Sequence, residues 1–329
     1  MSLPKLAITL GDRNGIGPEI TAKWLSRREK AIPTDYTVDI IGDCNALEEM
    51  AKRIQRPISV DRLESMGVEL IHVEADSIGE TSYRAIEIAA RGCLDETYAA
   101  MVTGPVSKAQ LQSSGFEFGG HTEILETLAK ESYPDCHAEM LFLYQQFRLM
   151  LLTRHIPLSQ VSSHLSVQNV HASLSQLLTF LQTHLQSPPR IAVMGLNPHA
   201  GEISGTEETE ILKPAMDSLN TSAETQIFHG PFSADALMRG FNALKPEYDA
   251  YVACYHDQGL IPMKLLGGLH AVNVTIGLPF IRTSVSHGTA EDIAGLGIAD
   301  ETSLVAAIDM AYSLSHCHTV PLPANILGI

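Results

Sequence analysis

The sequence is short of basic residues and aromatic residues, has no long apolar run, and so excludes several classes of protein. Lys and Arg number 22 against 38 Asp and Glu, a net charge of −16, and aromatic residues make up 6%. A surface of this charge repels nucleic acid and anionic membranes. No apolar stretch reaches the ~20 residues of a membrane span, and the N-terminus does not read as a signal peptide. We therefore expect a soluble cytoplasmic protein that binds neither nucleic acid nor membrane.

Cysteine is also scarce, and none of the cysteines forms a CxxC pair. The five are Cys44, Cys93, Cys136, Cys254 and Cys317. An odd, scattered set argues against a disulfide framework and against a thiolate zinc site, and it favours a reducing compartment. The rest is ordinary globular composition, 45% hydrophobic over 329 residues, which suits one large or two medium domains.

Short apolar runs alternate with helix-length segments along the chain. The expected strands are 6–10, 36–42, 68–73, 99–103, 139–144, 147–152, 190–196 and 251–254. The expected helices are 18–24, 45–53, 80–98, 123–130, 167–186, 207–218 and 301–315. A polar Gln145-Gln146 turn makes a hairpin of 139–144 and 147–152, and residues 230–235 lie between elements. This alternation predicts an α/β fold with a mostly parallel sheet.

Two glycine-rich loops precede predicted helices. Gly11-Asp-Arg-Asn-Gly-Ile-Gly17 follows the first strand, a geometry that holds anions or closely approaching ligands. Its spacing is neither GxGxxG nor GK[ST], so a tight turn without a ligand is an equal alternative. In Gly119-Gly-His-Thr-Glu123 the glycines admit a ligand, with His121 and Thr122 as donors. The alternative there is that Thr122 only caps the helix.

Three histidines, His155, His199 and His256, follow predicted strands. In an open α/β sheet, ligands bind beyond the carboxyl ends of the strands. A catalytic zinc-type site takes three protein ligands and keeps one position open, so the pattern favours a metal centre over three incidental histidines. Asp235 and Asp257 are candidates to orient these ligands. The residue types alone admit several divalent metals.

Polar and basic residues follow the third histidine within a short distance. They are Lys264, Asn273 and Arg282. In an acidic protein, basic side chains beside a ligand site are candidates for a carboxylate or phosphate clamp. A solvated surface position is the alternative for Lys264. A solvated surface position is less expected for Arg282, because Arg282 lies between Phe280-Ile281 and Thr283-Ser284.

Seven motifs, in one order, carry a resemblance to a known family. They are Gly-Ile-Gly-Pro-Glu (15–19), Thr-Gly-Pro-Val-x-Lys (103–108), Gly-His-Thr-Glu (120–123), Leu-Asn-Pro-His-Ala-Gly-Glu (196–202), Tyr-His-Asp-Gln-Gly (255–259), Asn-Val-Thr-x-Gly-Leu-Pro-Phe-Ile-Arg-Thr-Ser (273–284) and His-Gly-Thr-Ala (287–290). From about residue 6 to residue 312 the chain resembles the 4-hydroxythreonine-4-phosphate dehydrogenases of vitamin B6 synthesis. One departure is Gly-Asp-Arg-Asn-Gly (11–15), where many members have Gly-Glu-Pro-Ala-Gly.

The resemblance implies a fold like that of isocitrate and isopropylmalate dehydrogenases, with two α/β/α subdomains and the active site in the cleft between them. Residues 1–120 with 268–329 would form the first subdomain, on the nucleotide side. Residues 121–267 would form the second, with the metal ligands and the interface of a homodimer.

The resemblance also implies roles for individual residues. His155, His199 and His256 match divalent metal ligands, which in this family are shared between the two subunits of a dimer. Substrate-binding positions match His121, Thr122, Lys264, Asn273 and Arg282, and Lys264 is also the candidate for catalytic proton transfer. Residues that match the adenine-binding loop of the related dehydrogenases are His287, Gly288, Thr289, Ala290 and Asp292.

The implied reaction is the NAD- or NADP-dependent oxidation of 4-phosphohydroxy-L-threonine to 2-amino-3-oxo-4-phosphooxybutanoate, which decarboxylates to 3-amino-2-oxopropyl phosphate. The implied metal is zinc, magnesium or cobalt. Alternatives are a dehydrogenase of erythronate or threonate 4-phosphate, a metal-dependent hydrolase or aldolase without nucleotide, and a non-catalytic binding protein for phosphorylated acids.

Overall fold

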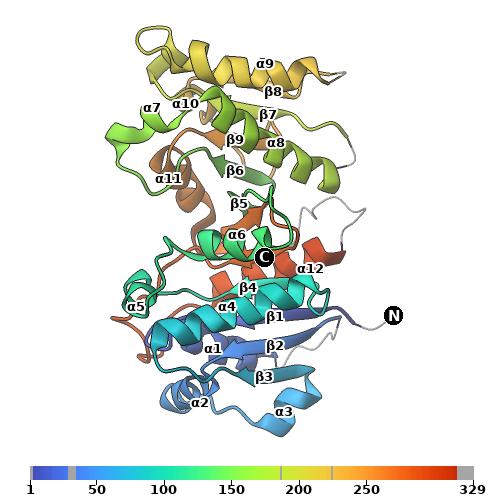
Figure 1. Ribbon diagram of the computed structural model, residues 1–329, viewed down its shortest axis with the longest axis vertical. Coiled ribbons are helices and arrows are strands. Elements are labelled where there is room, and N and C mark those ends of the chain that lie inside the picture. Colours follow the sequence, from blue (N-terminus) through green and yellow to red (C-terminus); the bar gives the residue numbers. More distant parts are fainter. Residues whose placement is uncertain (1–2, 29–34, 186, 224, 317–329) are drawn as a thin grey trace. The chain divides into compact units, whose positions relative to one another are not determined.

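The chain divides into two units by its internal contacts. The computed structural model describes residues 3–28, 35–185, 187–223 and 225–316 (Figure 1). The first unit comprises the described parts of 1–138 and 272–316, and the second comprises those of 139–271. The expectation from the sequence was 1–120 with 268–329 and 121–267; by contact, 121–138 groups with the first unit and 268–271 with the second. Cys317 and the expected irregular tail, 321–325, lie outside the described residues.

The first unit is a six-stranded part of the sheet in the order β3-β2-β1-β4-β11-β10, and only the β10–β11 pair is antiparallel. Its strands are β1 (Lys5–Thr9), β2 (Thr37–Gly42), β3 (Val68–His72), β4 (Ala100–Thr103), β10 (Val272–Ile276) and β11 (Arg282–Ser284). Its helices are α1 (Gly17–Arg28), α2 (Cys44–Arg53), α3 (Val60–Ser65), α4 (Ile78–Leu94), α5 (Lys108–Ser113), α6 (His121–Lys130) and α12 (Thr302–His316).

Helices cover both faces of these strands. Ala7 and Met101 face one side and pack in one buried cluster with residues of α4 and α6. Neighbouring residues on a strand point to the opposite side, and there the Thr283 hydroxyl donates to the Ala307 carbonyl of α12 at 2.8 Å. Strands buried on both faces explain why β1 and β4 read as continuous apolar runs rather than alternating ones.

The second unit contains the strands β5-β6-β9-β7-β8, of which only β5 and β6 pair antiparallel. They are β5 (Glu139–Tyr144), β6 (Phe147–Leu151), β7 (Ile191–Met194), β8 (Phe228–Phe232) and β9 (Ala250–Ala253). The helices are α7 (Val161–His164), α8 (Val167–His184), α9 (Lys213–Thr221), α10 (Ala234–Leu237) and α11 (His256–Gly267), with short turns η1 (Leu158–Gln160), η2 (Pro198–Gly201), η3 (Glu208–Leu212) and η4 (Gly268–His270).

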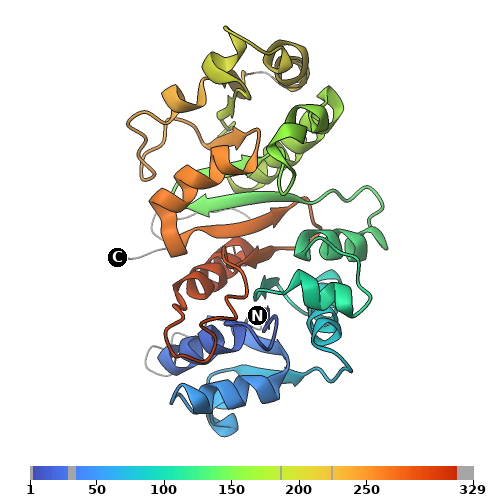
Figure 2. The same cartoon turned by 90° about the vertical axis from the view of Figure 1, so that its left-hand side faces the viewer.

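In this unit α11 packs on one face of the strands. Leu149, Tyr251 and Met263 belong to the same buried cluster, and Figure 2 shows α8 on the other side of the strands from α11. A Cβ on Gly259 would come within 2.7 Å of Leu151 and 2.8 Å of Leu149, so this glycine lets α11 lie close against β6.

The α/β class with mostly parallel strands is confirmed, and two local expectations are wrong. Residues 228–232 form strand β8, whereas 230–235 was expected to lie between elements. Its sequence, Phe-His-Gly-Pro-Phe, has a glycine and a proline at its centre, which is a turn signal, but pairing with β7 prevails. Helix α11 begins directly at His256, where no helix was expected. Among the described residues, no helix is long and apolar enough to cross a bilayer.

Candidate active site

Three hydroxyl side chains end adjacent parallel strands of the first unit. Thr9, Thr103 and Ser284 are the last residues of β1, β4 and β11, and they stand opposite one another in the register. Residues opposite each other on paired strands point to the same face. The carboxyl edge of this sheet therefore presents a polar row, at the position where α/β proteins bind ligands.

Arg282 lies across this polar row. It is 2% exposed, and its guanidinium donates to the Thr103 hydroxyl at 2.6 and 3.1 Å and to the Thr275 hydroxyl at 2.8 Å. No carboxylate of the described residues lies within ion-pair distance of it. Burial lowers the pKa of Arg282 to about 9. A buried cation whose partners are all neutral favours the binding of an anion, because the anion would compensate its charge.

Two more predicted substrate residues lie beside Arg282. His121 is the first residue of α6, and its enclosed Nε2 atom has no hydrogen-bond partner among the described residues. The pKa of His121 is lowered to about 3, mainly by burial and then by the Arg282 charge, while a hydrogen bond with the Gly104 backbone acts in the opposite direction. Asn273 of β10 stands opposite Ser284 of β11, and within the part of the chain that the structure describes its buried Oδ1 atom has no hydrogen-bond partner. Unsatisfied buried polar atoms of this kind need an explanation, and a bound ligand supplies one.

Thr122 is buried in α6, but it does not cap the helix. The N-cap is Gly120, and no side chain makes the capping hydrogen bond. The alternative that assigned Thr122 to capping is therefore wrong. The helix begins two residues earlier than expected, so His121 and Thr122 are both held by its first turn.

In the second unit, two of the predicted metal ligands face each other. The rings of His155 and His256 have centroids 5.5 Å apart. Imidazoles on one tetrahedral zinc ion, with metal–nitrogen bonds of ~2.0–2.1 Å, have centroids about 5 Å apart. The Nδ1 atom of His256 lies 2.7 Å from Asp257 Oδ1, an arrangement that holds a ligating histidine in one tautomer with Nε2 open to the metal. This pair fits a divalent ion.

Within the described residues, no three His, Cys, Asp or Glu side chains form a metal-binding group. His199 lies in η2, where His199 (φ 54°) and Ala200 (φ 53°) both adopt left-handed backbone conformations. An electrostatic interaction with His199 contributes to lowering the pKa of Asp235, after the larger effect of a hydrogen bond from Ser233. In the structure, His155 thus lies close to His256, and Asp235 lies near His199. The three histidines do not form one group within a single chain.

A buried carboxylate holds the loop that carries His199. Glu208 is 2% exposed and accepts from the Asn197 backbone at 2.7 Å and from its side-chain amide at 3.0 Å. Gln258 joins the loop to β9, since its amide accepts from Cys254 N at 2.7 Å and donates to Gly195 O at 2.8 Å. Consecutive left-handed residues are costly and persist where the surroundings fix them, as at functional sites.

Lys264 lies on α11, two turns beyond His256, about 12 Å further along the helix. Its side chain is largely exposed, while neighbouring protein atoms partly desolvate the ammonium and lower its pKa. A lysine in such a setting deprotonates more readily than one in water, which suits proton transfer.

The predicted nucleotide loop packs against the first glycine loop. The backbone N–H of Ile16 donates to the carbonyl of Thr289 at 2.8 Å, and a Cβ on Gly15 would lie 2.8 Å from that carbonyl. Ala290 is left-handed (φ 43°), and His287 Nδ1 lies 3.0 Å from the Gly288 carbonyl. Gly288 and Asp292 are exposed.

Sequence reasoning missed Thr9, Thr103, Thr275 and Ser284. The strand-end position that singled out the three histidines applies equally to Thr9 and Thr103. Threonine is common in strands for reasons of packing, so the signal does not distinguish a ligand-facing hydroxyl from a structural one. Pairing of β11 with both β4 and β10 is what gathers these hydroxyls around Arg282, and it is not visible in the sequence.

Comparison with known proteins gives a consistent result. Residues 21–311 match the family model described as "Pyridoxal phosphate biosynthetic protein PdxA". The chain is 38% identical to the 4-hydroxythreonine-4-phosphate dehydrogenase of Thermosynechococcus vestitus, covering 96% of this chain and 98% of that one. It is 36% identical to the D-threonate 4-phosphate dehydrogenase of Bordetella bronchiseptica, covering 95% and 93%.

A crystal structure of 4-hydroxythreonine-4-phosphate dehydrogenase from Klebsiella pneumoniae superposes with a TM-score of 0.80 at 31% identity, covering 95% of this chain and 98% of that one. The family expected from the seven motifs is thereby confirmed. By motif order, by sequence similarity over nearly its whole length and by its fold, the chain belongs to the family of the pyridoxal phosphate biosynthetic protein PdxA.

Proposed function

We propose that this protein is an NAD(P)- and metal-dependent dehydrogenase that oxidises 4-phosphohydroxy-L-threonine to 2-amino-3-oxo-4-phosphooxybutanoate, which then loses carbon dioxide to give 3-amino-2-oxopropyl phosphate. A homodimer with shared active sites and a cytoplasmic location are parts of the same proposal. The observation that carries it is the buried guanidinium of Arg282, which has no carboxylate of the described residues within ion-pair distance and has His121 and Asn273 beside it. The relatives named 4-hydroxythreonine-4-phosphate dehydrogenase support the same reading.

The binding roles follow from charge. Arg282 attracts an anionic group of the substrate, the phosphate in the first place, and a bidentate guanidinium contact would fix its orientation. His121 is neutral near pH 7 because its pKa is held at about 3, so its ring contributes a hydrogen bond without a second charge. The unpartnered oxygen of Asn273 accepts a hydrogen from the same ligand.

The proposed metal ligands lie in the second unit. His155 and His256 would hold a divalent ion, zinc, magnesium or cobalt, with Asp257 fixing the tautomer of His256. Because the described part of one chain offers no third ligand in that group, we assign the third position to His199 of the second subunit. When bound, the ion supplies Lewis-acid polarisation of the hydroxyl to be oxidised, and the nicotinamide accepts the hydride.

Lys264 would move the proton. Its lowered pKa makes the neutral amine more accessible near physiological pH. As the hydroxyl is oxidised its proton must leave, and the same ammonium can return a proton to the carbon after decarboxylation. His287, Gly288, Thr289, Ala290 and Asp292 would bind the cofactor.

A sugar-acid phosphate is the alternative candidate for the substrate. The relative from Bordetella bronchiseptica is named D-threonate 4-phosphate dehydrogenase, and this acid carries a hydroxyl where the amino acid carries an ammonium. Both substrates present the phosphate that Arg282 would bind. Turnover of the purified protein with each compound, with NAD or NADP and a divalent metal, decides between them. Formation of reduced cofactor from neither compound would contradict the proposed function.

A further inference from the structure

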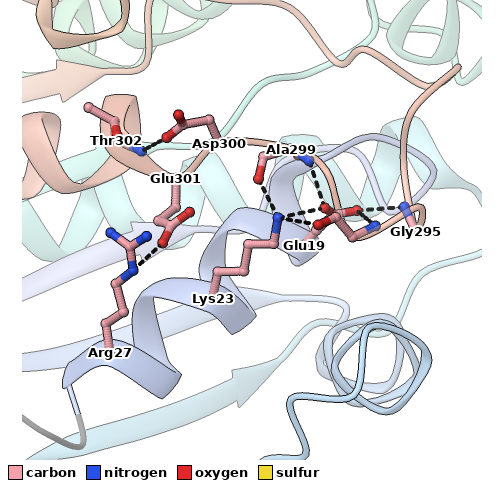
Figure 3. Close-up of polar contacts among 9 residues, drawn as sticks. Glu19, Lys23, Arg27, Gly295, Ala299, Asp300, Glu301 and Thr302 are labelled. Atoms are coloured by element: carbon pink, nitrogen blue, oxygen red, sulfur yellow. Dashed lines mark hydrogen bonds and ion pairs between the residues drawn. The ribbon is translucent and has the colours of Figure 1, made fainter.

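Helix α1 presents three charged residues along one face, at positions i, i+4 and i+8. They are Glu19, Lys23 and Arg27. Figure 3 shows all three directed at the irregular backbone that leads into α12. We call residues 287–301 the α1-bound segment; its first part is the predicted nucleotide loop.

Glu19 is the centre of these contacts. Its carboxylate is fully buried and accepts backbone N–H groups of Gly295 at 2.7 Å, Ala299 at 2.9 Å and Gly297 at 3.4 Å (Figure 3). Lys23 compensates the charge with an ion pair of 3.1 Å and donates to the carbonyls of Gly297 and Ala299. One carboxylate thus accepts hydrogen bonds from three main-chain N–H groups. Because the acceptor is charged, these hydrogen bonds are stronger than those between neutral groups.

The same helix fixes both ends of the segment. At the N-terminal end of α1, Ile16 N donates to Thr289 O. At its C-terminal end, Arg27 pairs with Glu301 at 2.6 Å. Between these points the segment has no regular secondary structure, so its conformation depends on groups outside it.

The backbone in this segment needs such support. Ala290 (φ 43°), Gly295 (φ 77°) and Gly297 (φ 73°) are all left-handed. Alternate N–H groups point to Glu19, and the intervening side chains, Leu296 and Ile298, are 57% and 65% exposed. Hydrophobic burial of these two side chains therefore contributes little to holding the segment. Removal of the carboxylate should release it while the sheet beneath stays folded.

We propose that Glu19 is a positioning residue for the dinucleotide: it holds the α1-bound segment in the conformation that binds the cofactor, without touching the cofactor itself. This inference rests on the proposed function, since it takes 287–292 as the nucleotide loop. Binding to a loop that is ordered in only part of the molecules weakens in proportion to that fraction.

The test is Glu19→Gln in the full-length protein. Glutamine has the same shape but keeps only one acceptor oxygen, so its NH2 group would face backbone N–H donors. If the binding-competent arrangement falls to roughly one molecule in ten, the dissociation constant for NAD rises about tenfold. We expect this increase by isothermal titration calorimetry, with the KM for NAD rising and kcat at saturating NAD maintained. Glu87→Gln, which alters a partly exposed carboxylate paired with Arg91 on α4, is the matched control and should leave NAD affinity unchanged.

Amide hydrogen exchange separates positioning from general stability. Faster exchange confined to peptides of 287–301, with β1 and β4 still protected, accompanies weaker NAD binding if Glu19 positions the segment. Faster exchange there with unchanged NAD affinity would overturn the inference, and so would unchanged exchange. Should Glu19→Gln not fold, the double variant Glu19→Gln with Lys23→Met removes both charges and avoids a buried unpaired ammonium; it carries the same expectations. Failure of the unaltered protein to bind NAD would instead refute the proposed function, so the two failures are distinguishable.

Discussion

Replacement of Arg282 by methionine should stabilise the ligand-free protein and abolish its response to phosphorylated ligands. One pKa unit corresponds to about 1.4 kcal/mol. A pKa of about 9 for Arg282, where 12.5 is usual, therefore means that burial disfavours the charged form by roughly 5 kcal/mol. At pH 7 the guanidinium is charged in both folded and unfolded states, so the folded state bears this cost.

The variant also loses the hydrogen bonds to Thr103 and Thr275, each contributing about 1 kcal/mol. Replacement of buried charges by apolar groups typically stabilises by ~1–4 kcal/mol, and we expect a gain of about 1–3 kcal/mol here. At a ligand concentration of 100 Kd, the unaltered protein should gain about 2.7 kcal/mol on binding, and the variant should gain nothing.

The assay is thermal unfolding with and without 4-phosphohydroxy-L-threonine. Arg148→Met is the control, because Arg148 is also buried but donates to two backbone carbonyls, Gln146 O and Asp249 O, in the second unit. It should keep the ligand-induced rise in melting temperature. The reasoning on Arg282 is refuted if Arg282→Met melts below the unaltered protein and still responds to the ligand.

Three further predictions concern the other site residues. His256→Ala should abolish divalent metal binding, and Asp257→Asn should weaken it by the ~10–100-fold typical of a residue that orients a ligand, as measured by competition with a metallochromic chelator. Lys264→Arg should lose turnover, because arginine does not deprotonate; retained kcat would show that only the charge matters. His121 has a folded-state pKa below its unfolded value of 6.5, so the stability it contributes is full above pH 6.5 and is lost as pH falls toward 3. His121→Gln should flatten the decline of stability over that range in urea unfolding at a series of pH values.

The elements of the fold were largely predictable, because strands buried on both faces and helices with apolar stripes leave clear patterns. Strands β5 and β6 were expected within one residue of where they lie, around the Gln145-Gln146 turn. The failures have local causes. In β8, glycine and proline mimic a turn. In α11, the interior Pro262 and Gly259 are both unfavourable in helices, so the sequence did not indicate one.

The candidate site was predictable by residue type but not by arrangement. Strand-end position identified His155 and His256, which the structure brings to 5.5 Å. It gave no indication that Thr103 and Thr275 solvate Arg282, since that contact depends on the antiparallel insertion of β11 beside β10. Nor did it reveal Glu19 as the acceptor for a segment some 280 residues away, because a glutamate in the first turn of a helix is explained equally well by the helix dipole.

The most direct test of the account is a turnover assay of the purified protein with NAD or NADP, a divalent metal ion and either 4-phosphohydroxy-L-threonine or D-threonate 4-phosphate. The account predicts metal-dependent formation of NADH or NADPH from 4-phosphohydroxy-L-threonine, with release of carbon dioxide and a higher kcat/KM than for the sugar-acid phosphate. No reduced cofactor from the amino-acid phosphate, with the protein folded and metal-loaded, would contradict it.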